Sequence, residues 1–400
     1  MKIREYIQVK PIGTVADPTV LCPANGYVLD VLTPANSWVL IAQFSNNSPF
    51  STTFDPKLTV SSSNKYAWNL GDGSVLINYS ELIYTYLSTL TRLVKLYAKS
   101  TNSLWITQIN FSSDNIVGIL DLSNTAFNRI SAFILNLNSL LTSVIFTATI
   151  TANTTYTIDL GDCNITGVLD LSMFTSFYNG TGCTINIINN ANLTNVLFST
   201  TPITAPFSIL NFSNCNITGV FDLSMLGVMG SSANISIANN SNLTGVIFAS
   251  TITNAVTTIE IYFTGIIGTL DVSMFIAWSS VGTLWIFGNS SMTNITFPSS
   301  TISGFIKLLN LSMNSSLGYI DLTKLKTGVN GLNWNLSMNS WSAAIVNRIL
   351  FNIDTISIGG FTGRIIDISA NTAPDTTSGG YNGSAAVSSL TSKGFIITTD

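Results

Sequence analysis

The chain has 400 residues, of which 46% are hydrophobic and only 8% are charged, with a net charge of −4 and no histidine. A typical soluble domain is about 25% charged, and the missing histidine excludes Ser-His-Asp and Cys-His catalysis and histidine-ligated metal sites. The sequence contains no run of about 20 apolar residues, which a membrane-spanning helix would need. The few lysines and arginines are scattered and form no basic stripe for nucleic acid.

The first segment, "MKIREYIQVKPIGTV", has basic residues but lacks the apolar core of a secretory signal. We therefore expect no leader here, and we interpret residues 1–35 as extra strands or an attachment arm. The cysteines are too few for a disulfide scaffold and form no CxxC pair. They are Cys22, Cys163, Cys183 and Cys215.

Residues 36–100 are rich in strand-like segments such as "SWVLIAQF" and "KLTVSS", followed by "YAWNLGDGS" and "IYTYLSTLTRLVKLYA". These residues resemble the polycystic-kidney-disease (PKD) type of immunoglobulin-like domain, which implies a β-sandwich over residues 36–100. Leu70 replaces the family's phenylalanine, and "STLTRL" replaces the glycine before the last strand. The matching positions are Trp68, Gly71, Asp72, Gly73 and Tyr86.

From residue 101 the sequence repeats itself. One series, with copies such as "ITGVLDLS" and "ITGVFDLS", places an aspartate every 49 to 52 residues, and a looser copy, "FTGRIIDIS", adds Asp367. A second series, with copies such as "LTNVLF", alternates with the first and places a phenylalanine in the same column. The unit is therefore 23–28 residues long, and we name its two forms the D-type and the F-type coil. The column residues are Asp121, Asp170, Asp222, Asp271 and Asp321, with Phe146, Phe198, Phe248 and Phe297 between them.

The unit resembles a leucine-rich repeat of the plant-like and bacterial surface-protein type. The family's LxLxxNxL core is filled by "IDLGDCNI" and "LNFSNCNI", although the Asn column often holds Cys, Ser or Asp and F-type coils are one residue longer. The resemblance implies a solenoid of about ten coils over residues 101–360, followed by a terminal coil and cap over residues 361–400. One coil cannot bury its own apolar face, whereas stacked coils share a continuous core. The first coil, near Leu104, must then be covered by the preceding domain or by another chain.

Several columns have structural interpretations. The aspartates lie about 10 Å apart on alternate coils, too far apart to share a calcium ion, and we expect them to cap turns. Cys163 and Cys215 are separated by a similar distance, so we expect buried free thiols. A turn column suits a left-handed backbone. It holds Gly118, Gly167, Gly219, Gly245, Gly268 and Gly318, with Asn195 and Asn294 at the same position.

The C-terminal segment breaks the repeat. Ser384 is suited to cap a short helix that runs to about Lys393, with Gly394 after its end and a final strand "FIITT". This segment predicts the polar lid that the last coil of a solenoid needs.

The exposed strand position between two inward residues forms a row, which is the candidate binding face. Its stacked amides favour a structural ladder, whereas concave solenoid faces commonly bind ligands. The ligand residues we select are Asp159, Glu260, Trp285, Asn211 and Asn186. Asp159 and Glu260 lie about 19 Å apart by strand spacing, too far for a glycosidase pair. The row is Asn110, Asn136, Asp159, Asn186, Asn211, Ser236, Glu260, Trp285 and Asn310.

We therefore expect a mainly β protein, with an N-terminal sandwich, a parallel solenoid and a C-terminal cap, and no enzymatic activity, metal or cofactor. The module combination resembles adhesive proteins of Bacteroidetes-type bacteria and their phages. It favours a phage virion appendage, such as a head or tail fibre, made in the host cytoplasm. Other virion proteins would bind its N-terminal region, and a host-surface glycan or protein would bind the solenoid, without nucleic acid or membrane insertion. A bacterial cell-surface adhesin is the alternative, and association into a homo-oligomer stays open.

Overall fold

The computed structural model is mainly β, with 41% strand and 9% helix, and contains β-solenoid coils with parallel sheets, which confirms the expected fold class. The chain divides into two compact units, Met1–Asn179 with Thr184–Ser199, and Gly180–Cys183 with Thr200–Asp400. The structure describes residues 20–21, 38–47, 53–60, 66–72, 75–77, 84–86, 90–99, 106–148, 150, 156–175, 177, 182–203, 205–252 and 254–400. Cys22, Gly73 and Leu104 lie outside these residues.

In the first unit, the N-terminal strands join directly onto the first coil. Strand β2 (Trp38–Asn46) pairs antiparallel with β8 (Arg92–Lys99) and also with β10 (Ile116–Leu122) of the coil. Strand β4 (Lys57–Val60) pairs antiparallel with β9 (Ile106–Asn110). Residues of the same chain therefore cover the edge of the first coil. The remaining N-terminal strands are β1 (Val20–Leu21), β3 (Thr53–Phe54), β5 (Tyr66–Asn69), β6 (Val75–Ile77) and β7 (Tyr84–Thr85).

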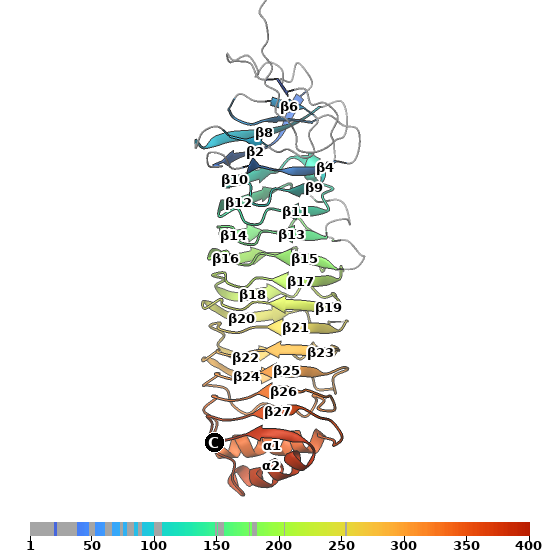
Figure 1. Ribbon diagram of the computed structural model, residues 1–400, viewed down its shortest axis with the longest axis vertical. Helices are drawn as coiled ribbons and strands as arrows, with labels where there is room; N and C mark the ends of the chain where they lie inside the picture. The colour runs from blue at the N-terminus through green and yellow to red at the C-terminus, as the bar shows by residue number, and fades with distance from the viewer. Residues whose placement is uncertain are drawn as a thin grey trace, which may run out of the picture. The chain divides into compact units, whose positions relative to one another are not determined.

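Each coil contributes one short strand to a parallel sheet. In the first unit these strands are β9, β11 (Ala132–Ile134), β13 (Thr157–Asp159) and β15 (Cys183–Asn186). The corresponding strands of the second unit also pair in parallel, in the order of the chain (Figure 1). They are β17 (Phe207–Asn211), β19 (Met229–Ser236), β21 (Val256–Glu260), β23 (Trp278–Trp285), β25 (Ile306–Asn310), β26 (Asn333–Asn335), β27 (Arg364–Asp367) and β28 (Phe395–Thr398).

The return segments explain the period of about 50 residues. Four of the five D-type coils form a second strand that pairs in parallel with the strand of the following F-type coil. The structural repeat is therefore a pair of coils, which is why the sequence alternates between two forms. The pairs are β10 with β12 (Leu140–Phe146), β14 (Thr166–Asp170) with β16 (Asn192–Leu197), β18 (Gly219–Leu223) with β20 (Leu243–Phe248), and β22 (Gly268–Asp271) with β24 (Met292–Thr296).

The turn-column prediction is confirmed at four D-type coils and wrong elsewhere. Gly118, Gly167, Gly219 and Gly268 have φ between 68° and 77°, and each sits where the strand register shifts by a bulge. At each bulge the glycine that opposes the extra residue has the left-handed backbone that glycine adopts freely. The extra residues belong to the F-type strands and are Thr142, Thr194, Thr244 and Thr293. The F-type positions Gly245, Asn195 and Asn294 lie inside regular strands, and the coil of Gly318 forms no strand there. None of these four has a left-handed φ.

A ladder of buried asparagines holds neighbouring coils together. Asn314 is fully buried, its Nδ2 donates to the carbonyls of Ile286 (2.7 Å) and Leu311 (2.8 Å), and its Oδ1 accepts from the amide of Asn289 (2.8 Å). One side chain thereby satisfies backbone groups that would otherwise be buried without partners. The ladder comprises Asn138, Asn190, Asn240, Asn289, Asn314, Asn339 and Asn371.

Cysteine takes the ladder position in two D-type coils. The Cys163 thiol donates to the carbonyl of Leu135 (3.2 Å), one coil earlier, and burial raises the pKa of this thiol to about 12. Cys163, Cys183 and Cys215 are all buried thiols outside any disulfide, which confirms the expectation for Cys163 and Cys215.

Two helices lie in the C-terminal part of the chain, α1 (Ala343–Ile356) and α2 (Gly383–Ser392). Short 3-10 helices lie at Ser378–Gly380, before α2, and at Thr125–Phe127 in the first unit. Helix α1 was not expected from the sequence, which placed only coils there. Helix α2 and the following strand β28 were expected, but the cap is Asn382, whose Oδ1 accepts from the amide of Ala385 (2.8 Å), rather than Ser384. Among the described residues, no helix is both long and apolar enough to cross a membrane.

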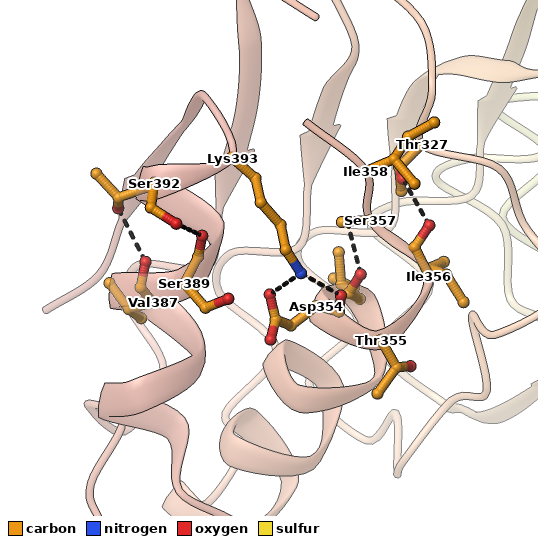
Figure 2. Close-up of polar contacts among 12 residues, drawn as sticks. Thr327, Asp354, Thr355, Ile356, Ser357, Ile358, Val387, Ser389, Ser392 and Lys393 are labelled. Carbon is orange, nitrogen blue, oxygen red and sulfur yellow. Dashed lines mark hydrogen bonds and ion pairs between the residues drawn. The ribbon is translucent and has the colours of Figure 1, made fainter. Parts of the chain in front are cut away.

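An ion pair joins the ends of the two helices (Figure 2). The ammonium of Lys393 donates to the carboxylate (2.7 Å) and to the main-chain carbonyl (2.8 Å) of Asp354. Nearby, the buried guanidinium of Arg364 lies 3.8 Å from the ring centre of Phe395 and donates to the carbonyl of Ile358 (2.8 Å). Lys393, directly after α2, thus binds α1, and Arg364 of β27 links β28 to the segment that follows α1.

Candidate functional site

In the first unit, the candidate row is a hydrogen-bonded ladder centred on Asp159. Its carboxylate accepts from Nδ2 of Asn136 (3.0 Å), from Nδ2 of Asn186 (2.9 Å) and from the amide of Gly161 (3.1 Å). The structure therefore brings Asp159 and Asn186 together. Burial raises the pKa of Asp159, and the hydrogen bonds from Gly161 and Asn186 only partly offset this shift. These bonds give Asp159 a structural role between three coils.

The placement of Asn136 in the row was wrong. Strand pairing puts Ile134 between Asn110 and Asp159, and Asn136 follows two residues later. The strand ends at Ile134, and Leu137, which the sequence pattern placed inside, has a left-handed φ of 61° and is 54% exposed. The local turn therefore overrides the hydrophobic alternation at this coil.

In the second unit, a chain of hydrogen bonds leads from Asn211 to Glu260. The Asn211 side chain accepts from the amide of Ser213 (3.1 Å), whose hydroxyl lies 2.6 Å from that of Ser236. The Ser236 hydroxyl in turn donates to the carboxylate of Glu260 (2.7 Å). Asn211, Ser236, Glu260 and Trp285 are neighbours across successive strands, as the row predicts. Asp159 and Glu260 belong to different units, and each is bound by groups of its own unit.

An aromatic cluster of Tyr262, Phe263 and Phe287 lies beside Trp285. The rings of Tyr262 and Phe287 stack with centres 4.5 Å apart, Trp285 lies 6.4 Å from Tyr262, and Phe263 packs on Phe287 at 5.1 Å. Phe263 is 46% exposed and holds a left-handed φ of 50°, which is costly for a bulky residue. Only Trp285 was selected from the sequence. The signal for the others was the letters "YF" and "WIFG" at corresponding places of adjacent coils.

A hollow of about 530 Å³ lies in the sheet face beside this group. Its main row consists of direct neighbours on five successive strands, which are Trp285, Asn310, Asn335, Asp367 and Thr398. The parallel row of Leu308, Asn333 and Ile365 lines it as well, together with Leu309. The hollow therefore begins at Trp285, includes Asn310 of the predicted row, and extends over three further coils where no site was expected, those of Asn335, Asp367 and Thr398.

Asp367 was assigned to the wrong column. The copy "FTGRIIDIS" suggested a turn aspartate, but Asp367 ends β27 and pairs directly with Asn335 in the main sheet. The preceding Gly363 has a left-handed φ of 65°, so the glycine turn here precedes a sheet strand instead of a return segment. This shift adds a carboxylate to the candidate site.

The amides of the hollow are oriented by the turns that follow them. Oδ1 of Asn310 accepts from the amide (3.1 Å) and hydroxyl (2.7 Å) of Ser312, and Oδ1 of Asn335 accepts from those of Ser337 at 3.1 and 2.8 Å. Oδ1 of Asp367 is bound in the same way by Ser369, at 3.0 and 2.6 Å. Because these oxygens are fixed, each amide has a defined orientation and its Nδ2 has no bond to another described residue.

The turn aspartates form no site of their own. In each of the five, Oδ1 accepts from the backbone amide two residues later at 2.8–2.9 Å, on Ser123, Ser172, Ser224, Ser273 and Thr323. Within the described residues, no three Asp, Glu or Cys side chains gather as metal ligands do.

Comparison with known proteins gives no relative. No family model, no curated protein and no solved structure matches the chain.

Proposed function

We propose that this chain is a non-enzymatic structural and recognition protein whose solenoid sheet face binds a host-surface glycan or protein. The observation that carries the proposal is the hollow of about 530 Å³ beside Trp285. A partly exposed tryptophan at the end of an oriented, mostly uncharged polar row is suited to recognition, because aromatic anchors dominate many binding surfaces. Two of the acidic row members, Asp159 and Glu260, are held in hydrogen bonds between coils.

We propose a bacteriophage virion appendage as the setting, with the N-terminal region bound to other virion proteins. Support comes from the composition, which is low in charge and rich in uncharged polar residues, and from the three buried cysteines of the described residues, which form no disulfide. A bacterial surface adhesin would use the same sheet face and is the alternative.

We also propose that the coils are of the leucine-rich type and that residues 36–100 are PKD-like. The first assignment is supported by the buried asparagine ladder at the position of the family's asparagine. The second is supported by the buried Trp68 and by the Tyr86 hydroxyl, which donates to the carbonyl of Leu70 (3.1 Å), as in the tyrosine corner of immunoglobulin-like sandwiches.

The test is immunogold labelling with an antibody raised against residues 200–400. Phage particles from lysed cultures and intact bacterial envelopes are compared by negative-stain electron microscopy. Label on particle heads or tails supports the virion setting, and label on envelopes alone favours the adhesin. Recognition itself is tested by the binding of the fluorescently labelled chain to intact bacteria. Absence of binding to every strain that expresses the gene or hosts the phage would contradict it.

A further inference from the structure

We infer that the hollow formed by Trp285, Asn310, Asn335, Asp367 and Thr398 is a binding site for a neutral oligosaccharide. This inference rests on the proposed recognition function and names its ligand class. The five residues are direct neighbours on consecutive parallel strands, so the row is about 19 Å long at the usual strand spacing. A row of that length suits an extended chain of several sugar rings.

The polar atoms of the row match sugar hydroxyls, which both donate and accept hydrogen bonds. Because Ser312 and Ser337 occupy the Oδ1 atoms of Asn310 and Asn335, the two Nδ2 groups are left as donors to a ligand. Oδ2 of Asp367 is left as an acceptor in the same way. The turns therefore set donors and an acceptor side by side before any ligand arrives, which reduces the entropy lost on binding.

The apolar part of the hollow suits the C–H faces of sugar rings. Trp285 closes one end, and its orientation is supported by the stacked pair of Tyr262 and Phe287. Leu308, which is 37% exposed, and Ile365 line the neighbouring row. Ligand sites generally combine an apolar lining with a few oriented polar groups, and this hollow has both.

The charges of the lining favour a neutral ligand. No lysine or arginine lines the hollow, and its one ionisable group is the carboxylate of Asp367. An anionic glycan or a phosphate would meet that carboxylate without a compensating cation. A peptide strand that adds to a sheet needs a free edge for its main-chain hydrogen bonds, and β25, β26 and β27 are each paired on both sides.

The test measures binding of the full chain to neutral hexasaccharides by calorimetry and tryptophan fluorescence. The probes are β-1,4-glucan, α-1,4-glucan and β-1,4-mannan hexasaccharides, with an oligogalacturonate of the same length as the anionic comparison. We expect at least one neutral probe to bind and the anionic probe not to bind. If no neutral probe binds, or if the oligogalacturonate binds more tightly than all of them, the inference is wrong.

Variants connect the binding to the hollow. Asn335→Asp keeps the oxygen that accepts from Ser337 but removes the Nδ2 donor, so the turn is retained; Asp367 shows that an aspartate is compatible with it. We expect Asn335→Asp and Trp285→Ala to weaken binding at least tenfold. Because the new carboxylate of Asn335→Asp lies directly opposite Asp367, the melting temperature of this variant should fall slightly, with the cooperative transition of the folded chain retained. Asn124→Asp is the matched control and should bind as the unmodified chain does, because Asn124 lies outside the row and the hollow and its Oδ1 likewise accepts from the amide two residues later, that of Ala126 (2.9 Å). Equal affinity in all three variants would overturn the assignment.

Cell binding separates this inference from the proposed function. If Trp285→Ala binds intact bacteria as tightly as the unmodified chain, the oligosaccharide site is refuted while recognition by another part of the protein stands. If the unmodified chain binds no bacteria, the recognition function itself fails.

Discussion

Replacement of Asn314 by alanine should destabilise the second unit far more than replacement of an exposed asparagine. The side chain is fully buried and satisfies the carbonyls of Ile286 and Leu311 and the amide of Asn289. Alanine leaves these three buried groups without the partner that Asn314 gives them. Each such loss costs about 1 kcal/mol or somewhat more, so we expect the free energy of unfolding to fall by about 3–5 kcal/mol.

The matched control is Asn242→Ala, which removes a single exposed hydrogen bond between side chains, donated by Nδ2 of Asn242 to Oδ1 of Asn216 (2.7 Å). We expect a change within about 0.5 kcal/mol, as for most surface substitutions. Urea denaturation followed by tryptophan fluorescence compares the two variants. Hydrogen exchange adds a local readout, because the amide of Asn289 should exchange faster only in Asn314→Ala. Equal shifts of the urea midpoint in both variants would refute the argument that the ladder holds the coils together.

Three further predictions concern single groups. Burial raises the pKa of Asp114 to about 8, so between about pH 4 and 8 the folded state holds a proton that the unfolded chain releases. The free energy of unfolding should therefore fall as the pH rises through this range, by at most about 1.4 kcal/mol per pH unit. In Asp114→Asn the urea midpoints at pH 5 and pH 8 should converge. Iodoacetamide at pH 8 should modify Cys163, whose thiol pKa is about 12, only after unfolding, as peptide mass spectrometry will show; rapid modification of the folded chain would contradict its burial. Gly167→Ala should lower the free energy of unfolding by about 1 kcal/mol, because φ is 68° at this position and the added Cβ meets no other atom. Gly245→Ala, at a position without a left-handed φ, should change it by only about a few tenths of a kcal/mol. Equal losses of stability in thermal denaturation would contradict the importance of the left-handed glycine at the bulge.

The coil architecture was predictable because a solenoid repeats the same local problem. Alternating apolar residues and the two alternating series, of which the D-type has a glycine in every copy, predicted stacked coils with parallel strands, and the structure has them. The left-handed glycines of the D-type coils were predictable for the same reason, since Gly167 and its counterparts occupy equivalent turns. The failure at Gly245 has a physical cause: in the F-type coil this column follows the extra residue of the bulge, Thr244, and continues the strand, so only the opposing glycine of the D-type coil, Gly219, is left-handed.

The candidate site was only partly predictable. Trp285 and Glu260 were selected because they interrupt a row of amides, but whether such residues face a hollow depends on the strands beside them. Asp367 was assigned to the turn column because its letters match that series, and only strand pairing placed it next to Asn335. Helix α1 was missed because its apolar residues also fit the repeat, and burial against the neighbouring elements decided in favour of a helix.

The sequence by itself determined the period, the two alternating coil types, the parallel strands and the polar character of the exposed row. These properties follow from residues within one or two coils, where spacing and backbone preference are sufficient. The tertiary structure alone decided which side chains share a surface and that β2 and β4 cover the first coil. It also decided that Ser312 and Ser337, each two residues after an asparagine of the hollow, orient the side chains of Asn310 and Asn335. These properties depend on the register between strands and on turns that a one-residue shift would rearrange, so letter patterns do not fix them.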